Sequence, residues 1–190
     1  RTLMVDLLTT NKTSFFREPA HFEFLAQQVI PEMASRGAQG RVWSAGCSSG
    51  EEAYTLAMCL HDGLEKRLPK GFRVLATDLS DRMLELAREA TYPADAVSTV
   101  PGPYQRRYLR EEAAGSGTVR VVGELRDLVK VARLNLLERW PMQGGFDAVF
   151  CRNVMIYFDR PTQVELVRRL IEMLQVGGYL FVGHSEGLHG

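Results

Sequence analysis

Short apolar runs alternate with amphipathic stretches along most of the chain. Apolar runs that end at a glycine or a polar residue predict strands, whereas apolar positions that recur every three or four residues predict helices. The predicted strands span 42–45, 72–77, 129–136, 146–151 and 179–183. Strands that alternate with helices and form continuous apolar runs are typical of a parallel sheet covered on both faces. The pattern therefore predicts an α/β, doubly wound, Rossmann-like fold.

Three helices are predicted between these strands. The first follows a glycine-rich loop, and its apolar face is formed by Ala53, Leu56, Ala57, Leu60 and Leu64. In the second, Ser80 is a candidate N-cap ahead of Met83, Leu84 and Ala87. The third has Pro161 in its first turn, and its predicted buried face consists of Val164, Val167, Leu170, Ile171 and Leu174.

Two regions depart from the alternation. Residues 1–40 contain a turn-forming segment at 9–11 and an amphipathic helix around Phe22, which Pro31 is expected to kink or end. Residues 91–128 are rich in proline and glycine and contain a β-type run at 118–122. We therefore expect an N-terminal segment (1–40) and one larger domain (41–190), with a small subdomain (91–128) inserted between its second and third strands.

Composition and charge narrow the class of protein. The chain has 190 residues, 45% hydrophobic and 24% charged, with 23 Lys and Arg against 23 Asp and Glu. These values are typical of one folded domain, and the zero net charge argues against a broad nucleic-acid surface. No apolar stretch approaches membrane-spanning length, and the Cys and His spacings match no metal site. We expect a cytoplasmic protein with no metal and no membrane insertion.

The turn after the first strand is the expected floor of a ligand site. In doubly wound sheets the ligand lies at the carboxyl ends of the strands, near the point where strand order reverses. Here the turn is Gly46-Cys-Ser-Ser-Gly50, followed at once by Glu51 and Glu52. Two carboxylates would repel the pyrophosphate of a dinucleotide, whereas S-adenosylmethionine (SAM) carries a sulfonium and an ammonium. Either glutamate could instead stabilise the helix by complementing its dipole.

Polar residues follow three other predicted strands. Asp78 ends the second strand, where a carboxylate that accepts hydrogen bonds from ribose hydroxyls is expected; the alternative is a helix cap. Asn135 and Asn153 stand near the ends of the third and fourth strands. Their amides suit an adenine or amino-acid group, although asparagine at a strand end is often a turn residue.

Several blocks closely resemble the chemotaxis receptor methyltransferase (CheR) family. They match in order from about residue 7 to the C-terminus, and the block at 146–159 is the most specific. The blocks are Thr9-Thr-Asn-Lys-Thr-Ser-Phe-Phe-Arg-Glu18, Arg41-Val-Trp-Ser-Ala-Gly-Cys-Ser-Ser-Gly-Glu-Glu52, Ala76-Thr-Asp-Leu79, Asn135-Leu-Leu137, Phe146-Asp-Ala-Val-Phe-Cys-Arg-Asn-Val-Met-Ile-Tyr-Phe-Asp159 and Gly183-His-Ser-Glu186.

The resemblance implies a class I SAM-dependent methyltransferase that esterifies glutamate side chains of chemoreceptors and releases S-adenosylhomocysteine. It implies that residues 1–40 cover the cofactor and that Tyr157 and Arg17 act at the transferred methyl. The residues that it implies for cofactor binding are Asn11, Thr13, Arg17, Gly46, Glu51, Asp78, Asn135, Leu136, Arg152 and Asn153. For Tyr157, packing at a helix start is the alternative.

The resemblance also implies which proteins this one binds. Chemoreceptor cytoplasmic helices would be the substrate, and a receptor C-terminal tail peptide could add to the inserted subdomain, for which the run 118–122 is a candidate open edge strand. From the resemblance we expect this sequence to lack the family's N-terminal helical domain, and five strands of the usual seven-stranded sheet can be placed in it. We read Cys47 and Cys151 as small buried residues rather than nucleophiles.

Two other functions remain open from the sequence. One is a nucleotide-cofactor oxidoreductase, which the Glu51-Glu52 pair and the missing G-x-G-x-x-G motif disfavour. The other is a non-catalytic module, from a truncated or fused family member, that binds SAM or a receptor without transferring methyl.

Overall fold

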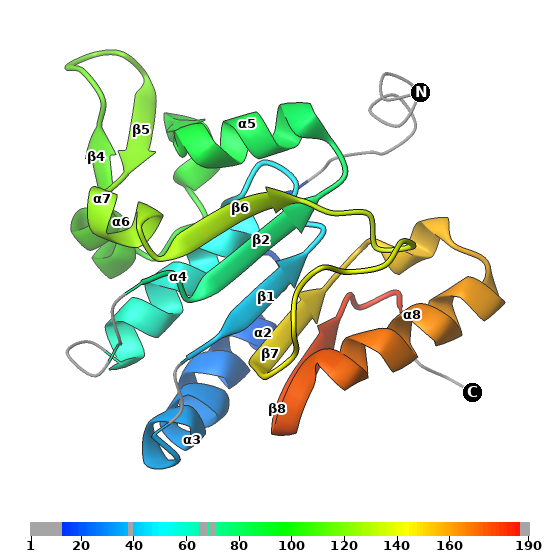
Figure 1. Cartoon of the computed structure of the whole chain (residues 1–190). Coiled ribbons are helices and arrows are strands. Elements are labelled where there is room, and N and C mark those ends of the chain that lie inside the picture. Colours follow the sequence, from blue (N-terminus) through cyan, green and yellow to red (C-terminus); the bar gives the residue numbers. More distant parts are fainter. Residues whose placement is uncertain (1–12, 38–39, 65–67, 69–70, 187–190) are drawn as a thin grey trace.

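A five-stranded parallel sheet forms the centre of the computed structural model, which describes residues 13–37, 40–64, 68 and 71–186 (Figure 1). Its strand order is β6-β2-β1-β7-β8. The strands are β1 (Val42–Ala45), β2 (Val74–Asp78), β6 (Val129–Arg133), β7 (Phe146–Cys151) and β8 (Leu174–Val182). The chain leaves β1 in one direction for β2 and β6, then returns to the other side for β7 and β8. The predicted doubly wound fold is confirmed, and strand order reverses at β1.

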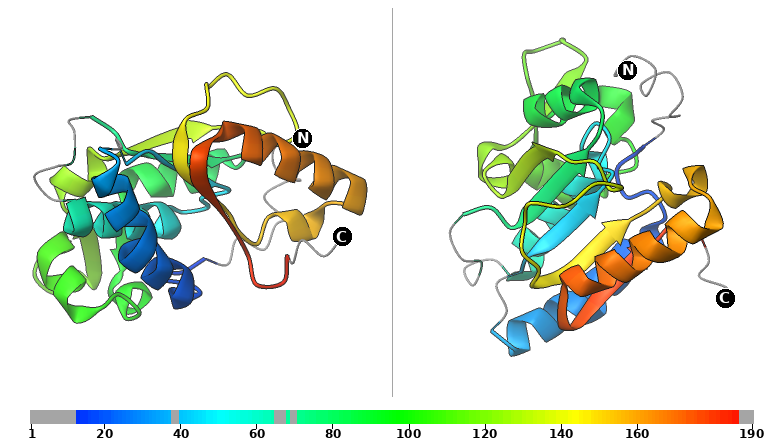
Figure 2. Two further views of the ribbon diagram at one scale, coloured as in Figure 1. Left: turned by 90° about the horizontal axis from the view of Figure 1, so that it is seen from below. Right: turned by 45° about the vertical axis from the view of Figure 1, so that its right-hand side comes forward.

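Helices cover both faces of this sheet (Figure 2). Alternate residues of each strand point to opposite faces, so Val42 packs in one core cluster and Trp43 in the other. The first cluster includes α4 (Glu51–Leu64), α5 (Asp81–Glu89) and the N-terminal helices, and the second includes α8 (Arg160–Met173). The predicted apolar face of α4 is buried, and Ser80 caps α5 by accepting a hydrogen bond from the Met83 N–H at 3.3 Å.

The buried face of α8 differs from the prediction. Val164 and Ile171 are 57% and 54% exposed, whereas the buried residues are Leu166, Leu170 and Met173. Both sets follow helical spacing, because apolar residues surround more than one side of this helix. Leu174, which was assigned to the helix, begins β8.

The N-terminal segment forms one bent helical stretch on the sheet. It comprises α2 (Pro19–Phe24), the π-helical turn η1 (Leu25–Val29) and α3 (Ile30–Ser35). Pro31 lacks an N–H and crowds the carbonyl four residues earlier, which explains a wider turn at this point. Pro31 therefore distorts the helix without ending it. The predicted turn at 9–11 lies outside the described residues.

The inserted segment forms a second, antiparallel sheet of three strands in the order β3-β5-β4. It contains β3 (Thr91–Pro93), η3 (Ala94–Val97), α6 (Gly102–Tyr108), β4 (Leu109–Glu111), β5 (Thr118–Val121) and α7 (Gly123–Arg126). The expectation that the run 118–122 forms an open edge is wrong, because β5 pairs with β3 on one side and β4 on the other. The open edges belong to β3 and β4.

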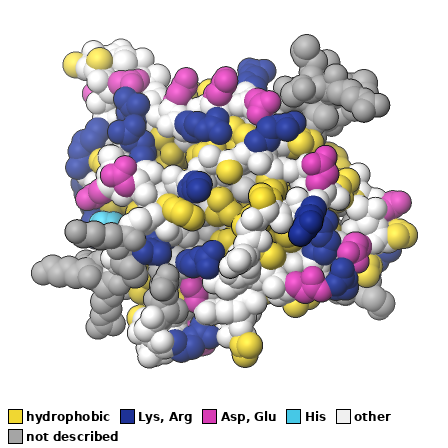
Figure 3. Space-filling view, viewed as in Figure 1, with side chains coloured by type: hydrophobic (Ala, Val, Ile, Leu, Met, Phe, Trp, Pro, Cys, Tyr) yellow, Lys and Arg dark blue, Asp and Glu magenta, His cyan; other side chains and the backbone are white. Residues whose placement is uncertain are grey.

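The visible surface mixes side chains of different kinds. On the face shown in Figure 3, Lys and Arg side chains are spread among Asp, Glu and apolar side chains.

None of the helices in the described part of the chain is both long and apolar enough to cross a membrane.

Candidate active site

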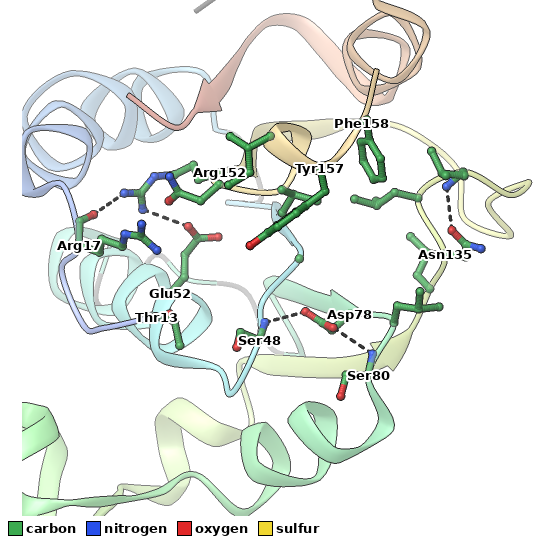
Figure 4. Close-up of a pocket in the computed structure, with 18 of the residues that line it drawn as sticks. Thr13, Arg17, Ser48, Glu52, Asp78, Ser80, Asn135, Arg152, Tyr157 and Phe158 are labelled. Atoms are coloured by element: carbon green, nitrogen blue, oxygen red, sulfur yellow. Dashed lines mark hydrogen bonds and ion pairs between the residues drawn. The ribbon is translucent and has the colours of Figure 1, made fainter. Parts of the chain in front are cut away.

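A cavity of about 640 Å³ lies where the strand order reverses, at the carboxyl ends of the central strands (Figure 4). Its size falls within the range of small-molecule sites. The segments that line it are Thr13–Arg17, the glycine loop, the residues after β2 and β6, and the loop that follows β7. These segments lie far apart in the sequence, and the parallel topology brings them together at one edge of the sheet.

The glycine loop is held tightly against β2. The N–H groups of Gly46 and Cys47 both donate to the Thr77 carbonyl, at 2.8 and 2.9 Å. Gly46 has a positive φ of 91°, and a Cβ on it would lie 2.4 Å from Cγ2 of Val154. A side chain at position 46 would therefore collide with the β7 loop, which explains why a glycine opens this turn.

Asp78 is fixed at the cavity wall by two backbone donors. Its Oδ2 accepts a hydrogen bond from the Ser48 N–H at 2.8 Å, and its Oδ1 accepts one from the Ser80 N–H at 3.0 Å. Each carboxylate oxygen has a second lone-pair direction, so Asp78 can order both turns and still accept bonds from two neighbouring hydroxyls. Ser80 rather than Asp78 caps α5, so the helix-cap alternative is wrong, whereas a ligand-binding role of Asp78 is compatible with this geometry and stays a prediction.

A buried ion-pair network forms the adjoining wall. The Arg152 side chain is only 2% exposed, and its Nη1 lies 3.0 Å from Oε2 of Glu52. Its Nη2 donates to the Arg17 carbonyl and lies 3.3 Å from Oε2 of Glu18. Oε1 of Glu52 accepts from the Ser44 hydroxyl at 2.7 Å. Arg152 therefore ties the N-terminal segment to the start of α4.

The two glutamates of this network differ in pKa. Burial raises the pKa of Glu52, even though Arg152 and the Ser44 hydroxyl act in the opposite direction. Burial acts to raise the pKa of Glu18 as well, but Arg152, together with His21 and the Asn153 side chain, acts in the opposite direction, and the pKa is lowered overall. Arg152 thus helps to keep the carboxylate of Glu18, on the more exposed side of the network, ionised.

Of the two glutamates after the glycine loop, Glu52 lines the cavity and Glu51 is not among the lining residues. Glu51 is 8% exposed, its Oε2 accepts from the Ser49 hydroxyl at 2.7 Å, and burial raises its pKa. Sequence reasoning chose Glu51 and left Glu52 undecided. A contact between Glu51 and the cofactor stays a prediction.

The remaining predicted cofactor residues lie around the same cavity, except one. Thr13, Arg17, Asn135, Leu136 and Asn153 are lining residues, whereas Asn11 lies outside the described residues. The Asn135 amide is engaged in its own turn: Oδ1 accepts from the Leu137 N–H and Nδ2 donates to Glu138, both at 3.0 Å. Asn135 therefore forms a turn and lines the cavity at the same time.

The outer part of the cavity is apolar and exposed. Tyr157 projects into the cavity from the β7 loop and is 46% exposed (Figure 4). Leu137 and Ile156, at 51% and 49%, also line the cavity. Sequence reasoning missed both, as well as Ser48 and Ser80; their position beside predicted site residues was the available signal. We call Leu137, Ile156 and Tyr157 the apolar mouth.

The cysteines near the site and the metal-binding groups of the described residues are the candidates for a direct chemical role. Burial raises the pKa of both Cys47 and Cys151, so neither thiol is prepared to ionise. Among the described residues, no group of three or more His, Cys, Asp or Glu is placed to hold a metal ion.

Fold and site together define a class of protein. A doubly wound sheet, a carboxylate after β2 that is fixed by backbone N–H donors, and an acidic helix start in place of a pyrophosphate site are the features of a Rossmann-like SAM-dependent methyltransferase.

Comparison with known proteins narrows this class to one family. The family model described as CheR methyltransferase, SAM binding domain, matches residues 11–190. The chain is 39% identical to a probable chemotaxis protein methyltransferase of Rhizobium etli, over 100% of this chain and 72% of that protein. It is 43% identical to chemotaxis protein methyltransferase 2 of Pseudomonas aeruginosa, over 97% and 66%. With the chemotaxis protein methyltransferase of Escherichia coli the identity is 44%, over 96% and 63%.

The chain belongs to the CheR methyltransferases, and it contains their SAM-binding domain. The resemblance found in the sequence is thereby confirmed, and SAM is the cofactor of this domain. The chain spans between 63% and 72% of the length of these three relatives.

The cavity lining fits this cofactor. Asp78 has two fixed carboxylate oxygens, which would suit a pair of ribose hydroxyls, and Leu134 and Leu136 form an apolar part of the lining, which would suit a base.

Proposed function

We propose that this protein transfers the methyl group of SAM to glutamate side chains of chemoreceptors, the methyl-accepting chemotaxis proteins, in chemotactic adaptation. The products are a glutamyl methyl ester and S-adenosylhomocysteine. The observation that carries the proposal is the division of one cavity into an anchored polar wall, suited to the cofactor, and an exposed apolar mouth. The names of the relatives support the setting in chemotaxis.

The proposed reaction needs positioning more than acid–base chemistry. SAM, when bound, supplies a methyl group already activated by its sulfonium. A glutamate carboxylate is ionised at neutral pH, so the protein has no proton to remove. The residues of the protein then have to hold the sulfonium methyl and the glutamate carboxylate in line and to exclude water. Good orientation is worth on the order of 7–11 kcal/mol of a reaction barrier.

The residues divide between two tasks in this proposal. Asp78 would hold the ribose, with Gly46, Glu51, Asn135, Leu136 and Asn153 around the rest of the cofactor, and Asn11, Thr13, Arg17 and Arg152 on its N-terminal side. Tyr157 and Arg17 face the acceptor: the tyrosine ring shields the reacting methyl group from water, and the guanidinium attracts the incoming carboxylate. The placement of Tyr157 within the cavity supports its role (Figure 4).

The partner that best fits the mouth is a helix. Leu137, Ile156 and Tyr157 offer apolar surface outside the cavity, which suits the apolar side of a helix that presents one glutamate inward. Since chemoreceptor methylation takes place on cytoplasmic helices, the expected place of action is the cytoplasm.

A receptor C-terminal tail peptide would add to the inserted sheet at an open edge. Pro93 in β3 has no N–H to donate, so β4 (Leu109–Glu111) offers the more complete edge. Strand addition to this short edge would need only main-chain hydrogen bonds and side-chain pockets.

The test is to incubate the protein with methyl-labelled SAM and receptor cytoplasmic fragments, and then to treat the product with alkali. Glutamyl methyl esters release labelled methanol under these conditions. Label that survives alkali would indicate N-methylation and contradict the proposal. Tight SAM binding with no label on the receptor fragments would indicate a non-catalytic binding module.

A further inference from the structure

The loop after β7 has an irregular backbone and carries part of the site. Asn153 has a positive φ of 58°, and the 3₁₀ turn η4 (Met155–Tyr157) follows it. Asn153, Ile156 and Tyr157 of this loop all line the cavity. A non-glycine residue with positive φ is strained, so the surrounding structure has to hold the loop in this shape.

One carboxylate from a distant segment binds the backbone of this loop. Oε1 of Glu186 accepts from the N–H groups of Met155 and Ile156, at 2.7 and 3.3 Å. Its Oε2 accepts from the N–H of Asn153 at 2.8 Å and from that of Gly183 at 2.7 Å. Glu186 is 8% exposed and is not a lining residue of the cavity. We call this set of four hydrogen bonds the Glu186 clamp.

Gly183 allows the clamp to close. A Cβ at position 183 would lie 2.7 Å from Oε2 of Glu186 and 2.9 Å from the backbone nitrogen of Asn153. These distances are shorter than normal contacts of a Cβ atom, so any side chain at 183 would push the loop and the carboxylate apart. The short segment 183–186 thus contributes two features that hold the loop after β7: the absence of a side chain at Gly183 and the buried carboxylate of Glu186.

We propose that Glu186 is a positioning residue for methyl transfer, acting through the backbone of the loop that carries Tyr157. This inference rests on the proposed function. A carboxylate has two acceptor oxygens with about four lone-pair directions, which matches four N–H donors. An amide has one acceptor oxygen and would turn an NH₂ group toward two of these donors. Charge-assisted hydrogen bonds are also stronger than neutral ones.

The first experiment compares Glu186→Gln with the control Glu165→Gln, which alters an exposed ion pair with Arg168. Displacement of a catalytic group by about 1 Å can cost on the order of 100-fold in rate. We expect Glu186→Gln to lower kcat for methyl transfer by about 100-fold and to weaken SAM binding by less than about 10-fold. Amide hydrogen exchange should become faster at Asn153, Met155, Ile156 and Gly183, and the control should match the wild type.

A double-mutant cycle tests whether Glu186 acts through the loop. If it does, Glu186→Gln should reduce kcat much less in a Tyr157→Ala background than in the wild type, because Tyr157→Ala already removes the ring that the loop positions. Additive effects would overturn the proposal. So would unchanged exchange at the four amides, or a parallel loss of SAM affinity, kcat and thermal stability, which would indicate a structural role alone.

Gly183→Ala is the second variant in case Glu186→Gln does not fold. It keeps the carboxylate but separates it from the loop, and it should show the same selective loss of kcat with faster exchange at the loop amides. Hydrogen exchange and SAM binding require no methyl acceptor. If the wild type esterifies no receptor glutamate, the proposed function fails, whereas intact exchange protection in Glu186→Gln would refute the clamp separately.

Discussion

The cavity has two walls that are built in opposite ways. The anchored wall consists of buried and half-buried polar groups, Asp78 with its two backbone donors and Arg152 with Glu52 and the Arg17 carbonyl. The apolar mouth consists of side chains about half exposed. Buried polar networks fix one geometry, because any unpaired member is costly. Exposed apolar side chains can adjust to a partner and gain from losing water.

This difference corresponds to the two kinds of ligand in the proposed reaction. A cofactor has one structure, and a fixed wall binds it without reorganisation. Methyl acceptors on different receptor helices vary, and a mouth held mainly by apolar contact tolerates variation. Changes in the anchored wall should therefore affect stability and cofactor affinity, whereas changes in the mouth should affect the acceptor alone.

The largest expected effect concerns Glu52→Ala. Removal of Glu52 leaves Arg152, whose side chain is 2% exposed, without its closest carboxylate. Breaking a buried ion pair from one side typically costs about 3–5 kcal/mol of unfolding free energy. Urea denaturation measures the loss. Glu165→Ala, which removes an exposed ion pair, is the control and should cost less than about 1 kcal/mol. Equal losses in the two variants would show that the network is not stabilising.

The second prediction concerns Asp78→Ala and cofactor binding. Loss of hydrogen bonds to a charged group costs about 1.5–3 kcal/mol each, so SAM affinity should fall by roughly 100-fold or more. Isothermal titration calorimetry measures this change. Asp81→Ala, which removes an exposed aspartate paired with Arg133 nearby, is the control. Unchanged affinity in Asp78→Ala would remove Asp78 from the site.

The third prediction concerns the apolar mouth. Ile156→Asp places a charge where an apolar helix face is expected to dock, so the KM for receptor fragments should rise by about 10-fold, equal to roughly 1.4 kcal/mol. The Kd for SAM should stay within about 2-fold of the wild type. Val164→Asp, at a similarly exposed position on α8, is the control. Equal KM changes in both variants would mean that the mouth has no special part in docking.

The fold was largely predictable because it depends on local pattern. Continuous apolar runs marked each strand of the parallel sheet, and Ser80 marked the start of α5. The errors arose where the pattern allowed more than one answer. Helix α8 has apolar residues on several sides, and packing alone selects Leu166 over Val164. The place of β5 in the middle of its sheet depends on pairing with two distant strands.

The site was predictable where it depends on strand ends. Asp78 and Gly46 lie at the cavity because parallel strands bring their carboxyl ends together. Glu51 and Glu52 are adjacent, but neighbouring helix residues point about 100° apart, so only the structure shows which one faces the cavity. Glu186 was quoted with its motif but given no role, because its partners at 153–156 lie some thirty residues away.

The smallest expected effect concerns pH and His21, at the edge of the anchored wall. Burial, and then the nearby Arg152 charge, lower the pKa of His21 below its ordinary value of 6.5. The unfolded chain then binds more protons than the folded one in the window below pH 6.5, so unfolding free energy falls as pH drops through that window. Urea denaturation between about pH 7.5 and pH 5.5 measures this change, and comparison with His21→Gln separates it from any change due to buried carboxyls such as Glu51 and Glu52, whose pKa burial raises. His21→Gln should flatten this part of the profile, and a profile identical to the wild type would show that folding does not lower the pKa of His21.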